Sequence, residues 1–161
     1  MAATQDIVAT YRRPGAVMRR LLGQGKREDR ALIFLMVGCL MVFVGSMPKV
    51  ARRAFETGSD VRVDLVDVLM PSIFILPLFM YGVAGLIYLV IRVVGSGVSA
   101  YGVRLVLFWS FLATSPLALL RGLTAGFVGP GIEVELVKVA WFGFFLWFVI
   151  AGFRTAAQEA V

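Results

Sequence analysis

Four long apolar runs, separated by short charged or glycine-containing segments, constrain the fold of this chain more than any other feature. They cover residues 31–47, 68–94, 101–120 and 132–153. The first has 17 residues and would be about 25 Å long as an α-helix, close to the thickness of a bilayer's hydrocarbon core. Only 16% of the 161 residues are charged and 60% are hydrophobic, unlike a typical soluble domain. The sequence predicts an all-α integral membrane bundle of about four transmembrane helices.

The runs divide the chain into three parts. Residues 1–30 form a basic, amphipathic cytoplasmic or interfacial segment, residues 31–153 the transmembrane domain, and residues 154–161 a short polar tail. Pro48 and the charges after it are expected to end the first span, so that residues 49–67 form the longest loop, with a short strand or a surface helix at 61–65. A second loop is expected at 121–131, where four glycines and a proline occur.

Three prolines lie inside apolar runs, with Pro71 near the start of its run and the other two deeper, where they predict bends. Pro77 removes a backbone donor within the second span and should kink it, and Pro116 should bend the third. The second span has 27 residues, more than a perpendicular helix needs, so it should tilt.

The first thirty residues combine apolar residues at helical spacing with arginines. Pro14 and Gly15 divide this segment, so we expect one or two short helices that lie on the membrane surface with their apolar face down. A disordered basic tail is the alternative. The candidates for binding anionic lipid headgroups are Arg12, Arg13, Arg19 and Arg20.

The net charge of +6 is unevenly distributed. Seven of the 16 lysines and arginines lie in the first thirty residues, immediately before an apolar run. This is where a positive-inside signal belongs, so the N-terminus is expected to be cytoplasmic. The same distribution argues against nucleic acid as a partner and favours membrane lipids.

The chain contains no histidine, which removes most catalytic and metal-binding designs. The spans also lack an acidic residue away from their ends, which ion coupling usually needs. We therefore predict no catalytic residue, no cofactor site and no metal site. The basic residues in or beside spans are expected to be interface anchors, with Lys138 able to meet Glu135 on one helix face; they are Arg92, Arg104, Arg121 and Lys138.

Small residues recur every fourth position through the third span and beyond it. This small-residue stripe predicts a close helix–helix contact, either within the chain or with a partner protein. Its members are Ser110, Thr114, Ala118, Gly122 and Gly126.

Two stretches resemble the Yip family, membrane proteins named for interacting with Ypt/Rab GTPases, in its short bacterial form. The first reads RPGAVMRRLL at 13–22 and REDRAL at 27–32, and the second reads YGVRLVLFWS at 101–110 and SPL at 115–117. The resemblance implies a cytoplasmic N-terminal segment followed by about five spans, one more than the four runs found here. It also implies a multi-pass protein of the bacterial inner membrane, and eukaryotic members resemble trafficking adaptors.

These observations favour a non-enzymatic membrane adaptor or scaffold that acts through helix packing and lipid contact. Two alternatives stay open: an accessory subunit of a larger bioenergetic membrane complex, and a small transporter or channel.

Overall fold

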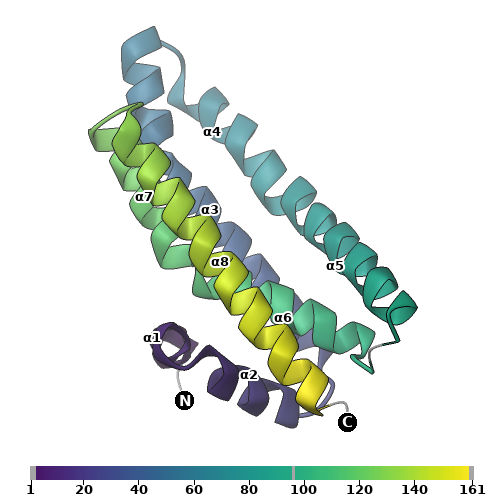
Figure 1. Ribbon diagram of the computed structural model, residues 1–161. Helices are drawn as coiled ribbons and strands as arrows, with labels where there is room; N and C mark the ends of the chain where they lie inside the picture. Colours follow the sequence, from purple (N-terminus) through teal and green to yellow (C-terminus); the bar gives the residue numbers. More distant parts are fainter. Residues whose placement is uncertain (1–2, 96, 160–161) are drawn as a thin grey trace.

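The structure is a computed structural model that describes residues 3–95 and 97–159, and the described chain consists of helices joined by short turns (Figure 1). In chain order they are α1 (Ala3–Arg12), α2 (Pro14–Gly23), α3 (Glu28–Thr57), α4 (Val61–Met70), the π-helical segment η1 (Pro71–Ile75), α5 (Leu76–Val93), α6 (Ala100–Ala113), α7 (Ser115–Phe127) and α8 (Ile132–Glu159).

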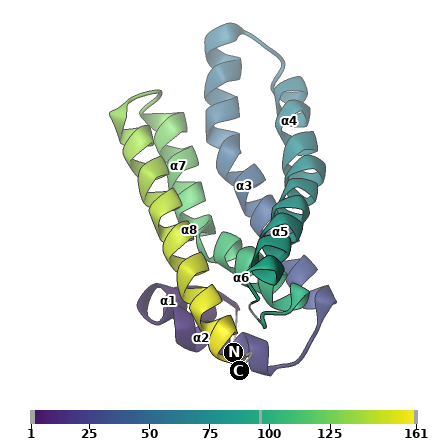
Figure 2. The ribbon, with the colours of Figure 1, turned by 45° about the vertical axis from the view of Figure 1, so that its right-hand side comes forward.

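Four helical stretches are long and apolar enough to cross a membrane, which confirms the predicted all-α, four-span architecture. The stretches are Glu28–Thr57, Val61–Val93, Ala100–Phe127 and Ile132–Glu159. The second consists of α4, η1 and α5, and the third of α6 and α7. Both described ends of the chain lie at the same end of the bundle (Figures 1 and 2).

The helices extend well beyond the predicted spans, so the expected long loops were wrong. Pro48 lies inside α3, and the turn between α3 and α4 comprises only residues 58–60, where Gly58 has a φ of 68°. A proline inside a helix removes one hydrogen bond, and the helical pairing of Arg52 with Glu56 at 2.7 Å favours continuation. Residues 61–65 are helical, as one of the two alternatives proposed, and not a strand.

The same correction applies to the later segments. Residues 121–127, expected in a loop, belong to α7, and the turn to α8 comprises residues 128–131. Residues 154–159, expected in a polar tail, form the last turns of α8, where Thr155 and Ala156 are buried against the bundle. Only part of each segment is buried, at Gly122 in the first and at Thr155 and Ala156 in the second, which residue polarity alone did not reveal.

Pro71, Pro77 and Pro116 lie at or beside irregular places in the second and third spans, whereas Pro48 lies inside a regular helix. The second span changes to π-helical hydrogen bonding over Pro71–Ile75, immediately before Pro77. The third span is interrupted at Thr114, and Pro116 lies in the first turn of α7, where its missing N–H costs no helical hydrogen bond.

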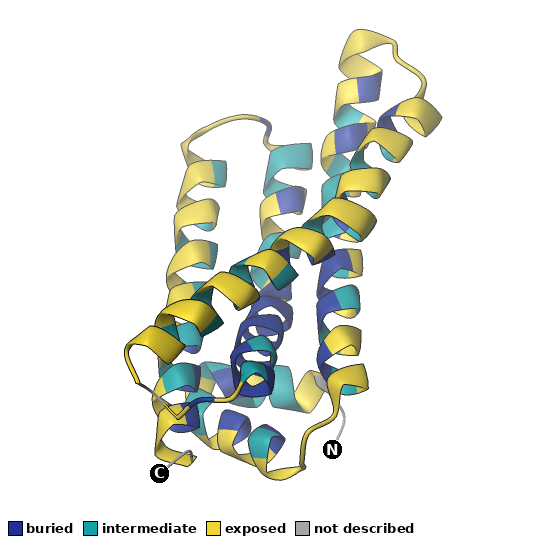
Figure 3. Cartoon of the chain, turned by 90° about the vertical axis from the view of Figure 1, so that its right-hand side faces the viewer, coloured by how far each residue is buried: buried dark blue, intermediate teal, exposed yellow. Residues whose placement is uncertain are grey.

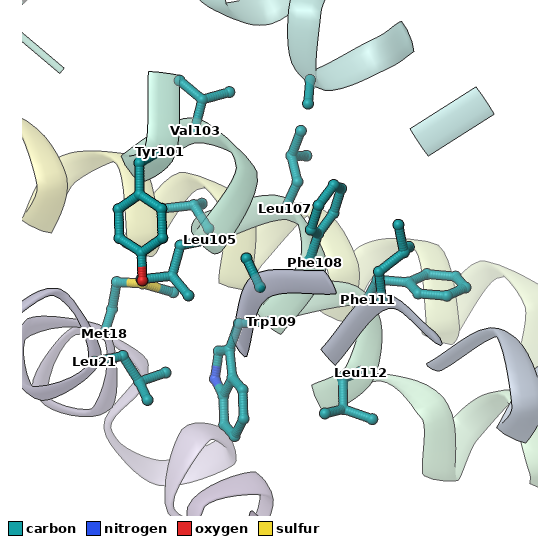
Figure 4. Close-up of a cluster of buried hydrophobic side chains, with 14 of the residues drawn as sticks. Met18, Leu21, Tyr101, Val103, Leu105, Leu107, Phe108, Trp109, Phe111 and Leu112 are labelled. Carbon is teal, nitrogen blue, oxygen red and sulfur yellow. The ribbon is translucent and has the colours of Figure 1, made fainter. Parts of the chain in front are cut away.

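Helix α6 lies at the centre of the molecule. All of its residues from Tyr101 to Ala113 except Arg104 are buried (Figure 3), and its side chains leave the helix in several directions (Figure 4). Tyr81 of α5 and Phe34 of α3 each make an edge-on ring contact with α6, at Phe108 and Trp109 respectively, with centroids 4.9 Å apart. The outward faces of α5 and α8 are mostly apolar and exposed, as lipid-facing helices are.

Candidate functional site

The small-residue stripe faces α3. A Cβ added to Gly122 would overlap the backbone carbonyl of Gly45, and one added to Gly126 would lie 2.7 Å from the carbonyl carbon of Pro48. The two backbones are therefore in direct contact, which only residues without a side chain allow. The stripe packs within the chain; the sequence had left open whether its neighbour was internal or external.

Helix α3 supplies a matching set of small positions. A Cβ on Gly38 would lie 2.7 Å from the Phe111 ring, and one on Gly45 would lie 3.2 Å from the carbonyl oxygen of Ala118. Contact positions later in α3 therefore meet positions later in α6 and α7, so α3 runs parallel to these two helices. Gly38, Gly45 and Arg52 are seven residues apart, the repeat expected of two helices that keep one seam in contact.

Arg52 lies at the end of this α3–α7 contact, next to the C-terminus of α7. Its guanidinium Nη1 donates to the carbonyl oxygens of Gly126 and Phe127, each at 3.3 Å, and these are carbonyls at the end of α7. A cation at a helix C-terminus also interacts favourably with the helix dipole. Gly129, with a φ of 99°, leaves room for the guanidinium, because a Cβ there would lie 2.7 Å from Nη2.

The two hydroxyl residues at the start of the stripe are buried. Thr114 Oγ1 lies 3.0 Å from the carbonyl oxygens of both Ser110 and Phe111, so it satisfies the backbone where the span is interrupted. The hydroxyl of Ser110 finds no hydrogen-bond partner among the described residues. Neither arrangement resembles a nucleophile beside a base.

The N-terminal helices α1 and α2, together called the docked pair, pack on the end of the bundle that carries both described ends of the chain (Figure 2). Trp109 Nε1 of α6 donates to Thr10 Oγ1 of α1 at 3.2 Å, and both residues are buried. Tyr11 packs its ring against Phe144 and Phe148 of α8, with centroids 5.4 and 5.1 Å apart. Burial raises the pKa of the Tyr11 hydroxyl above its ordinary value.

The apolar face of α2 is covered by the protein, contrary to the expectation that it lies in the membrane. Val17, Met18 and Leu21 are at most 5% exposed. A Cβ on Gly152 of α8 would lie 3.5 Å from the Met18 methyl group, so α2 packs closely on α8. The division at Pro14 and the helical state of both pieces are as predicted, and the disordered-tail alternative does not hold for residues 3–23.

The four predicted headgroup-binding arginines have different environments. Arg12, Arg13 and Arg19 are exposed, and Arg19 Nε lies 3.3 Å from a carboxylate oxygen of Glu159. Arg20 forms an ion pair with Asp6, whose side chain is 13% exposed. The first three therefore form the outward basic surface of the docked pair, and Arg20 faces α1.

Arg30 and Arg104 join the N-terminal segment to the bundle. Arg30 Nη2 donates to the carbonyl oxygen of Leu21 at 2.7 Å and contacts the Tyr101 hydroxyl at 3.0 Å. Arg104 forms an ion pair with Glu28. The predicted pairing of Lys138 with Glu135 is confirmed at 2.9 Å.

A cavity of about 390 Å³ lies between the docked pair and the bundle. Its walls come from α1, α2, the start of α3 and α6, and its lining residues include Asp6, Arg20, Gln24, Arg30, Phe34 and Trp109. The sequence did not predict this cavity, because its walls come from segments up to about a hundred residues apart. The only sequence signal was the presence of Arg20 and Arg30 beside apolar residues at helical spacing.

Within residues 3–95 and 97–159, no three histidine, cysteine, aspartate or glutamate side chains are grouped so as to hold a metal ion. A scan against protein-family models found no match, and searches of curated proteins and of solved structures found none either.

Proposed function

We propose that this chain is a non-enzymatic, multi-span membrane protein of Yip type that acts as an adaptor or scaffold. The observation that carries the proposal is the docking of α1 and α2 on the bundle, which presents Arg12, Arg13 and Arg19 outward from a fixed platform. An ordered basic surface beside a membrane suits an acidic partner segment or anionic headgroups, since both bring negative charge to that surface.

The packing of the spans supports a scaffold over a transport pathway. Gly122 and Gly126 of the third span pack against α3, and the Thr114 hydroxyl donates to the backbone, so these positions do not line an open polar path. The buried centre is formed by the apolar side chains of α6. A rigid, filled interior suits a protein whose partners bind at its surface.

We propose that the end carrying α1 and α2 is cytoplasmic and that the membrane is the bacterial inner membrane. Ten of the 16 lysines and arginines lie at this end of the bundle and six at the other, and the first segment should dominate the orientation. The basic residues at the proposed cytoplasmic end are Arg12, Arg13, Arg19, Arg20, Lys26, Arg27, Arg30, Arg92, Arg104 and Arg154.

An accessory subunit of a larger membrane complex is the second candidate, favoured by the outer face of α8. Phe142 and Trp147 are 54% and 44% exposed there, a face that either lipid or a neighbouring subunit would cover. Aromatic side chains are enriched in the cores of protein interfaces.

Cross-linking in native membranes, followed by purification in mild detergent, tests the proposal. A triple variant, Arg12→Gln with Arg13→Gln and Arg19→Gln, should lose the cross-linked partner. The matched control at the other end of the bundle, Lys49→Gln with Arg53→Gln and Arg62→Gln, should keep it. A stoichiometric complex that survives the first triple variant would favour the accessory subunit. Ion or solute flux through proteoliposomes of the pure protein would contradict both proposals and indicate a transporter or channel.

A further inference from the structure

The cavity between the docked pair and the bundle combines two kinds of surface. Its polar lining includes the side chains of Arg20, Arg30 and Gln24, and its apolar lining includes Phe34 and Trp109. Its volume of about 390 Å³ falls within the range of small-molecule sites. A ligand that fits both surfaces has a polar, anionic part and an apolar part.

The charges favour an anion. Asp6 is the acidic residue of the lining and offsets one of the two arginines, which leaves one net positive charge. The guanidinium of Arg30 is held in place by three acceptors: Nη2 donates to the carbonyl oxygen of Leu21 and the hydroxyl of Tyr101, at 2.7 and 3.0 Å, and Nη1 donates to the side-chain oxygen of Gln24. Little side-chain freedom is therefore lost when a ligand binds. A planar guanidinium matches the oxygens of a phosphate better than an ammonium group does.

The position of the cavity favours a lipid over a soluble phosphate compound. Arg30 lies in the first turn of α3, where a membrane-crossing helix begins. Ile33 and Val37 follow Arg30 by three and seven residues, so they lie on the same helix face, and they are 56% and 38% exposed. An acyl chain can lie along this exposed apolar face while the phosphate reaches Arg30.

We infer that this cavity binds the phosphate headgroup of an anionic phospholipid, whose acyl chains lie along α3. The inference rests on the proposed membrane-embedded scaffold and deepens it: a lipid bound here bridges α2 and α3 and fastens the docked pair to the bundle. The outward arginines Arg12 and Arg13 would attract anionic lipids only diffusely, whereas this cavity selects one headgroup by shape and hydrogen bonding.

The test uses the full-length protein in an uncharged detergent, with phosphatidylglycerol or phosphatidylcholine titrated into the micelles. The rise in melting temperature reports binding. Phosphatidylglycerol should stabilise the protein and phosphatidylcholine should not. Arg30→Gln should weaken the apparent affinity about tenfold, because it removes a charge-assisted hydrogen bond. Arg53→Gln, an exposed position at the other end of the bundle, is the control and should leave the affinity unchanged; an equal loss in both variants would overturn the inference.

Asp6→Asn separates binding from a purely structural role and keeps the test decisive where Arg30→Gln does not fold. Removing the competing carboxylate should tighten phosphatidylglycerol binding severalfold even though the lipid-free protein loses its ion pair with Arg20. Weaker or unchanged lipid binding in Asp6→Asn would contradict the site. Inorganic phosphate alone should give no shift, and a shift equal to that with lipid would assign the cavity to a soluble phosphate compound instead. None of these outcomes depends on a protein partner, so the site can fail while the scaffold proposal stands.

Discussion

Gly122 of α7 lies so close to Gly45 of α3 that a methyl group on Gly122 would overlap the Gly45 carbonyl. The contact joins the first and third spans backbone to backbone, and it lies midway between the Phe111 contact with Gly38 and the cap that Arg52 places on α7. In lipid, where apolar surface gains little from association, such close packing is a main source of helix–helix stability.

Gly122→Ala should therefore destabilise the protein by more than about 2 kcal/mol, because a rigid backbone and not a flexible side chain occupies the space. Gly143 of α8 is the matched control, since a Cβ there meets nothing within 4 Å. Gly143→Ala should be neutral or stabilising by about 0.5–1 kcal/mol. Thermal unfolding in one detergent measures both. Equal melting temperatures for the two variants would mean that the seam is not closed in this way.

Removing the Arg52 cap on α7 should lower the free energy of unfolding by less than Gly122→Ala does. Arg52→Gln should cost about 1 kcal/mol, because two helix-end carbonyls lose a cationic donor and the pairing with Glu56 is lost. The adjacent Arg53 is exposed, so Arg53→Gln should leave the unfolding free energy unchanged. Chemical denaturation of both variants in detergent provides the comparison, and a larger effect at Arg53 would rule out the cap.

Much of this fold follows from the sequence, but the contacts between its helices do not. Four spans were predictable because hydrocarbon thickness fixes the length of an apolar run, and the breaks near Pro77 and Pro116 followed from missing backbone donors. The end of the first helix was placed too early, since Pro48 was treated as a stop although a proline can be accommodated inside a helix. The stripe at Gly122 was recognised from its spacing, whereas its neighbour Gly45 was not, because a pattern within one helix does not specify which helix it contacts.

A buried hydrogen bond between Trp109 of α6 and Thr10 of α1 contributes to the docking of α1. Thr10→Val keeps the shape of the side chain but leaves the Trp109 indole N–H without its acceptor, which should cost about 1–3 kcal/mol. Hydrogen exchange over residues 3–23 should accelerate while exchange in α3 and α8 stays unchanged. Thr4→Val, at an exposed position of the same helix, is the control. Uniform acceleration across all helices would show that α1 and α2 do not detach independently of the rest of the bundle.

The raised pKa of Tyr11 predicts that the protein loses stability at alkaline pH. Burial raises its pKa above the ordinary value of 10.0, so the unfolded chain loses this proton at a lower pH than the folded chain does. The stability that comes from keeping Tyr11 neutral is complete below about pH 10 and falls as the pH rises toward the folded-state pKa. The melting temperature should therefore drop less between pH 9 and pH 11 in Tyr11→Phe than in the wild type. An identical drop in both proteins would contradict the burial of this hydroxyl.

The central proposal is that the four helical spans place both described ends of the chain on the cytoplasmic side and the α3–α4 and α7–α8 turns on the other. Single cysteines at Gly58, Pro130, Gly25 and Gln158, in a Cys39→Ala background, test it with a membrane-impermeant maleimide on intact cells. The turn positions, Gly58 and Pro130, should label from outside, whereas Gly25 and Gln158 should label only after permeabilisation. Labelling of Gly25 in intact cells, or opposite accessibility of Gly58 and Pro130, would contradict the account.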